Sequence, residues 1–237
     1  TKAHVQLIVP NVTSCYNDTQ DPVEESIPMC LLHNFPAMIE HCIQWARDNF
    51  NGYFTDVVSD CKNFLEDKQK YYDGLKKEGN ISVQLDKLSQ VKKIIEIANS
   101  NSFDKCIEFA IERYTQNFDH NIMQLLYNFP EDYVNNDGSK FWSGAKRVPH
   151  PIKFNPNDEM GLGFVSSYAI ILARALGIKE TTDFNYIKQY SANVNVPAYV
   201  PKKVKIKVNE TDPDEETNFG QKEENELASL IQELSII

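Results

Sequence analysis

The amino-acid sequence predicts a mainly α-helical, multi-helix domain with a small two-stranded β connection that joins the points where the chain enters and leaves it. Three stretches with apolar residues at three- and four-residue spacings, near residues 81–98, 103–126 and 157–177, predict long helices. Short runs of β-branched and apolar residues near both ends, 4–9 and 204–208, predict the strands. With 237 residues the chain is long enough to bury a sizeable core.

The first quarter of the chain predicts a strand, a loop and a helix. Residues 4–9 form the strand, and the polar stretch 17–26 reads as a loop, so that residues 1–25 comprise the first strand and a crossover loop. After Pro36 a helix is expected, and residues 54–77 are expected to be helical too. We expect one face of the helix after Pro36 to point into the core, because it carries an apolar stripe of Met38, Ile39, Cys42, Ile43, Ala46 and Phe50.

The central part, within a helical domain spanning residues 26–200, contains the strongest helix signals. Residues 81–98 carry one apolar side, and Ser102 is a plausible N-cap for the helix that follows. Residues 132–143 contain Asn135-Asn136-Asp137-Gly138, which is typical of a turn. A further helix is expected from residue 157 or 158 to Gly177, because glycine commonly follows a helix end.

The end of the chain predicts a strand, an acidic linker and a short helix. Residues 201–209 contain the second strand, which we expect to pair with residues 4–9 and so bring the two ends together, as in a domain inserted into a larger protein. Residues 210–237 comprise the linker and a terminal helix. Eight carboxylates and one cation, Lys222, lie between Glu210 and Glu226, which indicates a solvated connector, with an acidic docking tail as the alternative.

Composition excludes several classes of protein. The net charge of −10 disfavours sequence-independent nucleic-acid binding, and no apolar run reaches the roughly 18 residues of a membrane span. Five cysteines with no zinc-type spacing support neither a disulfide framework nor a structural metal, so we expect a reducing intracellular compartment. Because the chain begins without methionine or a signal pattern, we interpret it as an excised fragment.

Cys30 is the candidate reactive residue. It lies between Pro28 and Pro36, which restrict the backbone on both sides, just before the helix that follows Pro36. A thiol on such a stiff segment can stay exposed and react if its surroundings favour the thiolate. The alternative is that Cys30 is a small buried hydrophobic side chain, the commoner role of free cysteine. Cys42, Cys61 and Cys106 are expected in the core, and Cys15 has no assigned role.

Five segments in chain order resemble the ubiquitin-activating enzymes, and in particular their second catalytic cysteine half-domain. The active-cysteine segment is SIPMCLLHNFP (26–36), and the others are HVQLIVP (4–10), QLLYNFP (124–130), FWSGAKRVPHP (141–151) and VPAYVP (196–201), the last followed by VKIKV (204–208). Together they span nearly the whole chain.

The resemblance implies that Cys30 is the catalytic residue. It would accept adenylated ubiquitin as a thioester and pass it to a ubiquitin-conjugating enzyme. The implied partners are ubiquitin, conjugating enzymes and the adenylation domain of the same polypeptide, with no nucleic acid and no membrane. ATP and magnesium would bind in the missing adenylation domain, so that the fragment has no cofactor or metal and is inactive alone. The implied location is cytoplasmic and nuclear. The alternative function is a helical protein-interaction module with a structural Cys30.

Residues around Cys30 depart from the family pattern in two places. The family has threonine directly after the cysteine, where this chain has Leu31, and it usually has lysine or arginine at the position of His33. His33 is expected to be a surface or structural residue, and His41 a structural one. The loop 132–143 with Trp142 resembles the family's cap over the active cysteine, with a plain surface loop as the alternative. Lys146, Arg147 and His150 are assigned to local structure before catalysis.

Overall fold

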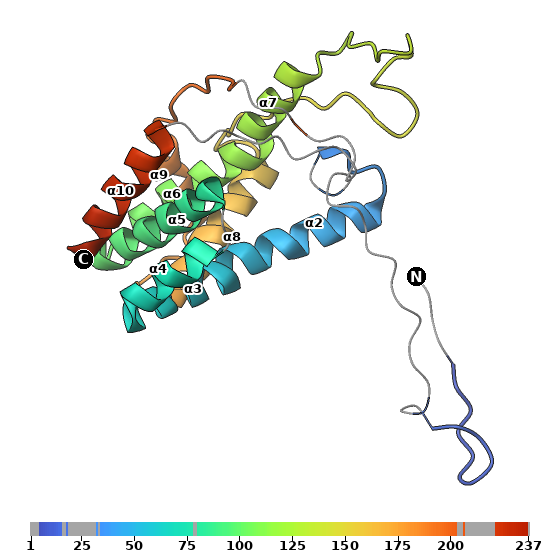
Figure 1. Cartoon of the computed structure of the whole chain (residues 1–237), viewed down its shortest axis with the longest axis horizontal. Helices are drawn as coiled ribbons and strands as arrows, with labels where there is room; N and C mark the ends of the chain where they lie inside the picture. The colour runs from blue at the N-terminus through green and yellow to red at the C-terminus, as the bar shows by residue number, and fades with distance from the viewer. Residues whose placement is uncertain are drawn as a thin grey trace.

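The computed structural model (Figure 1) describes residues 5–15, 18, 32, 34–77, 80–202, 206 and 221–236. Regular structure within these residues is helical, apart from one antiparallel β-bridge between Val134 and Lys140. The mainly α-helical class is therefore confirmed. The elements are α2 (Ile39–Asn51), η2 (Gly52–Asp56), α3 (Val57–Glu66), α4 (Lys68–Lys77), α5 (Ile81–Ser100), α6 (Phe103–Thr115), η3 (Gln116–His120), α7 (Asn121–Asn128), α8 (Glu159–Ala175), α9 (Phe184–Ser191) and α10 (Gln221–Ser235).

Two long helical rods each contain a π-helical turn. In the first rod α2 runs through η2 into α3, and in the second α6 runs through η3 into α7, with right-handed helical backbone at the junctions. The first rod lies along the lower edge of the helical body in Figure 1. A π-helical turn holds an extra residue, so it changes the phase of the side chains between the two halves of a rod. The sequence pattern gave no sign of either π turn.

The main core lies where α6 packs against α8, with α3, α5, α9 and the end of α10 around them. Its fully buried side chains include Phe64 from α3, Ile107 from α6, Leu172 from α8 and Leu234 from α10. The predicted helices at 81–98, from residue 103 and at 157–177 supply most of this core. Helix α9 was not predicted, because its eight residues carry too short an apolar pattern.

Side chains at the helix ends explain the boundaries. Asn80 caps α5 by accepting hydrogen bonds from the N–H groups of Ser82 and Val83, and Asp158 caps α8 by accepting one from Gly161 at 2.6 Å. Gly177 has φ of 69°, which glycine adopts without strain and which ends the helical run as predicted. The segment 54–77 breaks at Asp67, whose backbone is extended, into α3 and α4. Ser102 precedes α6 as expected but makes no side-chain cap bond.

The two-stranded connection stays a prediction. Residues 5–9 form no strand in the structure. A turn follows them, in which the Thr13 hydroxyl donates a hydrogen bond to Leu7 O and accepts one from Val9 N–H. Their expected partner, residues 204–208, lies outside the described residues except for Ile206. The acidic linker 210–220 also lies outside them, whereas the predicted terminal helix is α10.

The prediction that the apolar stripe of α2 points into the core is wrong. Ile39 is 67% exposed, Ile43 62% and Phe50 50%, and the Cys42 thiol is exposed as well. The more buried residues of α2 are His41, Gln44, Trp45, Asp48 and Asn49, which lie on the opposite face. The apolar face of α3 does reach the core through Val57, Cys61 and Phe64. The π turn between the two helices is the physical reason that the two apolar faces are out of phase.

Candidate functional site

Cys30, the predicted catalytic residue, lies outside the described residues, together with Leu31 and His33. Its assignment therefore remains a prediction. The structure does describe the residues that follow it. Leu32 is 1% exposed and Phe35 is 5% exposed, so the chain is fixed by two buried side chains shortly after Cys30. The site can therefore be built from the residues that hold this segment.

Phe35 packs into a small apolar cluster that is separate from the main core. The Phe35 ring meets Phe141 edge to face, with 5.6 Å between ring centroids, and lies 6.0 Å from the ring of Trp142. Phe129 stacks on Phe141 at 4.3 Å. Such ring pairs stabilise by about 0.5–1.5 kcal/mol each beyond the burial of their area. We call this cluster the aromatic anchor, and it consists of Phe35, Leu125, Phe129, Phe141 and Trp142, with Ile206 also packed against it.

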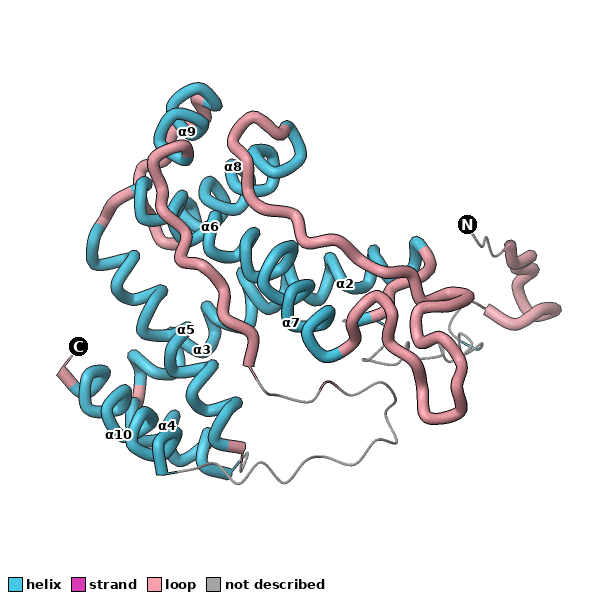
Figure 2. The backbone as a smooth tube through the Cα atoms, turned by 90° about the horizontal axis from the view of Figure 1, so that it is seen from above, coloured by secondary structure: helices cyan, strands magenta, loops and turns pink. Residues whose placement is uncertain are grey.

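The loop 132–143 presents two members of the aromatic anchor. It forms a small hairpin around Gly138, which has φ of 83°, closed by the Val134–Lys140 bridge. Asp137 accepts hydrogen bonds from the N–H and hydroxyl of Ser139, at 2.9 and 2.6 Å, and these bonds lower the pKa of its carboxyl. The turn predicted at residues 135–138 is confirmed. Figure 2 shows this loop projecting beyond the end of α7.

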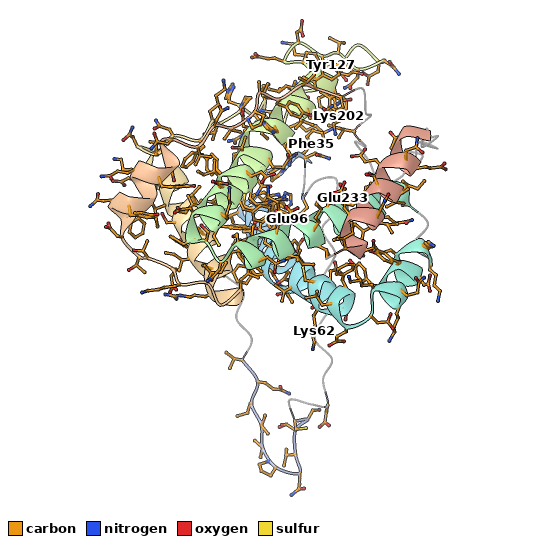
Figure 3. The ribbon with its side chains drawn as sticks, turned by 90° about the vertical axis from the view of Figure 1, so that its left-hand side faces the viewer. Phe35, Lys62, Glu96, Tyr127, Lys202 and Glu233 are labelled. Carbon is orange, nitrogen blue, oxygen red and sulfur yellow. The ribbon has the colours of Figure 1, made fainter. Side chains whose placement is uncertain are left out.

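Trp142 fastens the hairpin to the end of α7. Its indole Nε1–H donates to the carbonyl oxygens of Phe129 and Pro130, at 3.1 and 3.0 Å. The carbonyl of Phe129 lies at the end of α7, where backbone oxygens lack helical partners, and the indole supplies one. The carbonyl of Pro130 also accepts a hydrogen bond from Tyr133 N–H at 2.9 Å. Figure 3 shows the same region, with Phe35 labelled beside α7 and Tyr127 near its end. The hairpin is thus fastened through Phe141 and Trp142, whereas its residues 136–140 are exposed.

Lys146 adds a positive charge to the aromatic anchor. Its ammonium lies 5.0 Å from the centre of the Phe35 ring and 4.5 Å from that of Phe141. An ammonium over an aromatic face gains about 0.5–2 kcal/mol, depending on how far it is desolvated. Lys146 is half-buried, whereas Arg147 and His150 are exposed. The structure thus gives Lys146 the local role that the sequence suggested and adds a cation near the segment that follows Cys30.

His41 positions the start of α2. It is 6% exposed, and its Nδ1 accepts a hydrogen bond from Ala37 N–H at 3.2 Å. Met38 occupies the N-cap position and makes no side-chain cap bond, so the imidazole satisfies a backbone donor there instead. The predicted structural role of His41 fits this geometry. Because α2 begins three residues after Pro36, His41 also fixes the direction in which the chain leaves the aromatic anchor.

The remaining described cysteines divide into two kinds. Cys61 and Cys106 are buried, and burial raises the pKa of each thiol to about 11, so that neither forms a thiolate readily at neutral pH. The prediction that they lie in the core is confirmed. For Cys42 the same prediction is wrong, because its thiol is exposed on the outer side of α2. Cys15 is exposed.

Neither a metal site nor a membrane span is found among the residues that the structure describes. No three histidine, cysteine, aspartate or glutamate side chains there gather closely enough to hold a metal ion. In the same residues, no helix has the length and apolar character needed to cross a bilayer.

The aromatic anchor was missed by the sequence reasoning. Its contacts join Phe35 to a loop far along the chain, and periodicity carries no information on such contacts. A weak signal was present, because Phe35 and Phe129 each precede a proline at the end of a polar or helical stretch. A phenylalanine before proline lies on extended backbone, where it can leave a helix and pack elsewhere.

Comparison with known proteins gives consistent matches along the chain. The sequence profile of the family described as "Ubiquitin-activating enzyme, SCCH domain" matches residues 36–237. The ubiquitin-like modifier-activating enzyme 1 of Dictyostelium discoideum is 39% identical over 238 residues, covering 99% of this chain and 23% of that protein. The ubiquitin-activating enzyme E1 1 of Schizosaccharomyces pombe is 36% identical, again with 99% and 23% coverage.

A human relative agrees with these two. The ubiquitin-like modifier-activating enzyme 1 of Homo sapiens is 35% identical over 211 residues, which covers 89% of this chain and 20% of that protein. The chain therefore spans less than a quarter of the length of the relatives that it matches. The profile match begins at Pro36, after Cys30, whereas the alignments with the first two relatives cover nearly the whole chain.

Proposed function

Because this chain belongs to the ubiquitin-activating enzyme family and is a fragment of such an enzyme, we propose that Cys30 accepts ubiquitin as a thioester and passes it to a ubiquitin-conjugating enzyme. The observation that carries the proposal is the similarity to ubiquitin-activating enzymes over 99% of the chain, which includes the segment of Cys30. The burial of Leu32 and Phe35 supports it, since a fixed segment can hold a thiol in a defined place.

The proposed reaction has two acyl transfers. In the first, the Cys30 thiolate attacks the C-terminal carbonyl of ubiquitin adenylate, the carbon–sulfur bond forms, and the bond from the carbonyl carbon to the phosphate oxygen breaks to release AMP. The thiol proton passes to solvent before the attack. In the second, the thiolate of the conjugating enzyme attacks the same carbonyl, and Cys30 leaves as a thiolate. A thiolate suits both steps because it is a strong nucleophile and a good leaving group.

The described residues would act by positioning. The aromatic anchor holds the backbone after Cys30, and His41 fixes the start of α2 beyond it. The ammonium of Lys146 is held over Phe35 and Phe141, so a positive charge lies beside the ring five residues after Cys30. Such a cation would favour the negative charge of a thiolate that came close to it. The hairpin with Trp142 would form the cap over Cys30 that the family resemblance implies.

ATP and Mg²⁺ would be used elsewhere in the whole enzyme. The sequence holds no G-x-x-x-x-G-K-[ST] phosphate loop, so its residues do not fit ATP by that motif. We assign adenylation to another domain of the same polypeptide and expect the fragment to be inactive alone. The partners would be ubiquitin, conjugating enzymes and that adenylation domain, with the enzyme in the cytoplasm and nucleus. The proposed pairing of residues 4–9 with 204–208 would join the fragment to the rest of the chain.

The test compares two cysteine variants in the full-length enzyme. The enzyme is incubated with ubiquitin, ATP and Mg²⁺, and the adduct that is cleaved by dithiothreitol is measured on a non-reducing gel. Cys30→Ala is expected to abolish the adduct. Cys42→Ala, which removes the next thiol along the sequence, is expected to retain it. ATP–pyrophosphate exchange, which reports adenylation, is expected to survive in both variants.

The opposite outcome would support the alternative function. An adduct that persists in Cys30→Ala would mean that Cys30 is a structural residue in a helical interaction module. Leu31 provides a further check, because the family has threonine at that position. If a hydroxyl there assists thioester formation, Leu31→Thr raises the rate, and an unchanged rate would mean that the leucine is functionally equivalent.

A further inference from the structure

The outer face of α2 is apolar and exposed in the part of the chain that the structure describes, although Phe50 near its end meets Phe54 of η2 with 5.0 Å between ring centroids. Its exposed side chains form what we call the outer stripe of α2, namely Ile39, Cys42, Ile43, Ala46 and Phe50. They recur at spacings of three and four residues, so they lie in one line along the helix. Met38, just before the helix, extends the line and is 56% exposed. Single exposed apolar residues are normal, but a continuous row along one helix is not.

Charged residues do not interrupt the outer stripe of α2. Glu40 and Arg47 are exposed, but both lie at the same edge of the stripe, because they are seven residues, about two turns, apart. An apolar surface with charges only at its rim has the composition of an interface core. This arrangement differs from a solvated helix face, on which charged residues are spread throughout.

The inner face of α2 is largely polar. His41 is buried there, Gln44 donates to Asp48 within the helix at 2.8 Å, and Asn49 donates to Trp45 O at 2.8 Å. The aromatic contact on this face is that of Trp45 with Phe118, whose ring centroids are 5.8 Å apart. A helix that turns polar side chains toward the domain and apolar ones away is opposite to the usual amphipathic arrangement. A surface outside the described residues must therefore be considered as the partner of the apolar face.

We propose that the outer stripe of α2 is a docking surface for another part of the same polypeptide, which covers it with an uncharged apolar surface. The chain spans 23% of the length of its first two relatives, so more than three quarters of such a polypeptide lies outside it. Permanent contacts between parts that always occur together are the more apolar class of interface. Ubiquitin and the conjugating enzyme must bind and leave, so a lasting apolar contact suits them less well.

The docking surface is continuous with the proposed site. Helix α2 begins directly after the segment that the aromatic anchor holds, and His41 connects the two through Ala37. A contact on the outer stripe would therefore fix α2 and the segment of Cys30 against the rest of the enzyme. The inference goes beyond the proposed function, because it concerns the position of this domain and not the identity of the nucleophile.

Cys42 provides a probe within the outer stripe itself. The native full-length enzyme is treated with N-ethylmaleimide, and the labelling rate of Cys42 is followed by peptide mass spectrometry, which separates it from the other cysteines. The reference is an unstructured peptide with the sequence of residues 38–50. If the stripe is covered, Cys42 is expected to react roughly tenfold or more slowly than in the peptide, because reaction then requires local opening.

A matched pair of variants locates the contact. Ile43→Glu places a charge within the stripe and is expected to bring the labelling rate of Cys42 back to within a few-fold of the peptide. Arg47→Glu places the same charge at the edge of the stripe and is expected to leave Cys42 protected. The rate in the unaltered enzyme needs no variant, so it tests the proposal even if Ile43→Glu does not fold.

Several outcomes would overturn the proposal. Labelling of Cys42 in the native enzyme at the rate of the peptide would show an uncovered stripe. Protection that disappears on dilution would identify a second copy of the enzyme as the occupant. Protection that arises only after ubiquitin or a conjugating enzyme is added would identify that partner instead. Thioester formation on Cys30 is measured in parallel on enzyme that has not been treated with N-ethylmaleimide. If no thioester forms while Cys42 is protected, the proposed function is contradicted and the docking surface is not.

Discussion

Tyr53 and Asn117 join the two π-helical turns of the structure to each other. The Tyr53 hydroxyl donates to Asn117 Oδ1 at 3.0 Å and accepts from Asn117 Nδ2 at 2.8 Å. Tyr53 lies in η2 and Asn117 in η3, so the pair connects the two helical rods at the place where each changes phase. Burial raises the pKa of Tyr53, and the bond with Asn117 opposes that shift.

Removing this pair should destabilise the chain in a coupled manner. Tyr53→Phe and Asn117→Ala are each expected to lower the free energy of unfolding by about 1 kcal/mol, because each leaves a partner without its hydrogen bond. In the double variant the losses should not add, giving a coupling energy of about 0.5–1.5 kcal/mol in a urea-unfolding cycle. Additive losses would show that the two π turns are held independently.

The sequence predicted helices far better than it predicted which surfaces they cover. Helices α5 and α8 have complete local signals, since apolar periodicity lies between an N-cap residue and a helix-ending residue. For α2 the periodicity correctly marked an apolar face, but its direction depends on η2 and on surfaces beyond the described residues. A pattern within one helix holds no information on either.

The candidate site was predictable in part for the same reason. The turn at Asn135–Gly138 follows from local residue types, whereas the stiff backbone expected around Cys30 stays a prediction. The aromatic anchor follows from contacts between distant segments, so neither the role of Phe35 nor the place of Lys146 could be derived from spacing. The nucleophile itself remains a prediction that rests on family membership.

The charge of Lys146 should stabilise the aromatic anchor. Lys146→Met keeps most of the length of the side chain but loses the ammonium over the rings of Phe35 and Phe141, so unfolding should become easier by about 1 kcal/mol. Lys140→Met is the control, because Lys140 is exposed in the hairpin that presents Phe141 and has no ring contact of this kind described. Urea unfolding, together with amide hydrogen exchange of residues 139–146, measures the difference. Equal effects of the two changes would show that the cation does not stabilise the anchor.

Helix α10 should depend on one buried leucine more than on its ion pair. Leu234 is fully buried, and Leu234→Ala is expected to cost about 2–5 kcal/mol of stability through lost burial and a cavity. Its neighbour Glu233 forms an ion pair with Lys92 of α5 at the surface. Figure 3 labels Glu233 and Glu96 in this region. Glu233→Gln should change the urea midpoint little, since exposed ion pairs contribute little. A larger loss from Glu233→Gln than from Leu234→Ala would contradict the assignment.

Alkaline pH should destabilise the fold through Cys61 and Cys106. Burial raises both pKa values to about 11 from about 9 in the unfolded chain, so above pH 9 the unfolded thiols lose protons that the folded ones keep. The unfolded state then binds fewer protons, and stability falls as the pH rises from 9 to 11. The stabilisation is fully present below pH 9, and each thiol is expected to account for about 1–2 kcal/mol of the loss.

The double variant Cys61→Ala/Cys106→Ala separates this effect from the titration of other groups. It should be less stable at pH 8, because two small cavities form in the core, but its free energy of unfolding should fall less steeply between pH 9 and 10.5. Buried tyrosines such as Tyr114, whose pKa burial also raises, titrate in both proteins and do not affect the comparison. Urea unfolding at several pH values gives the two slopes. Equal slopes would mean that the thiols ionise as readily in the folded chain as in the unfolded one, and the buried setting assigned to them would then be wrong.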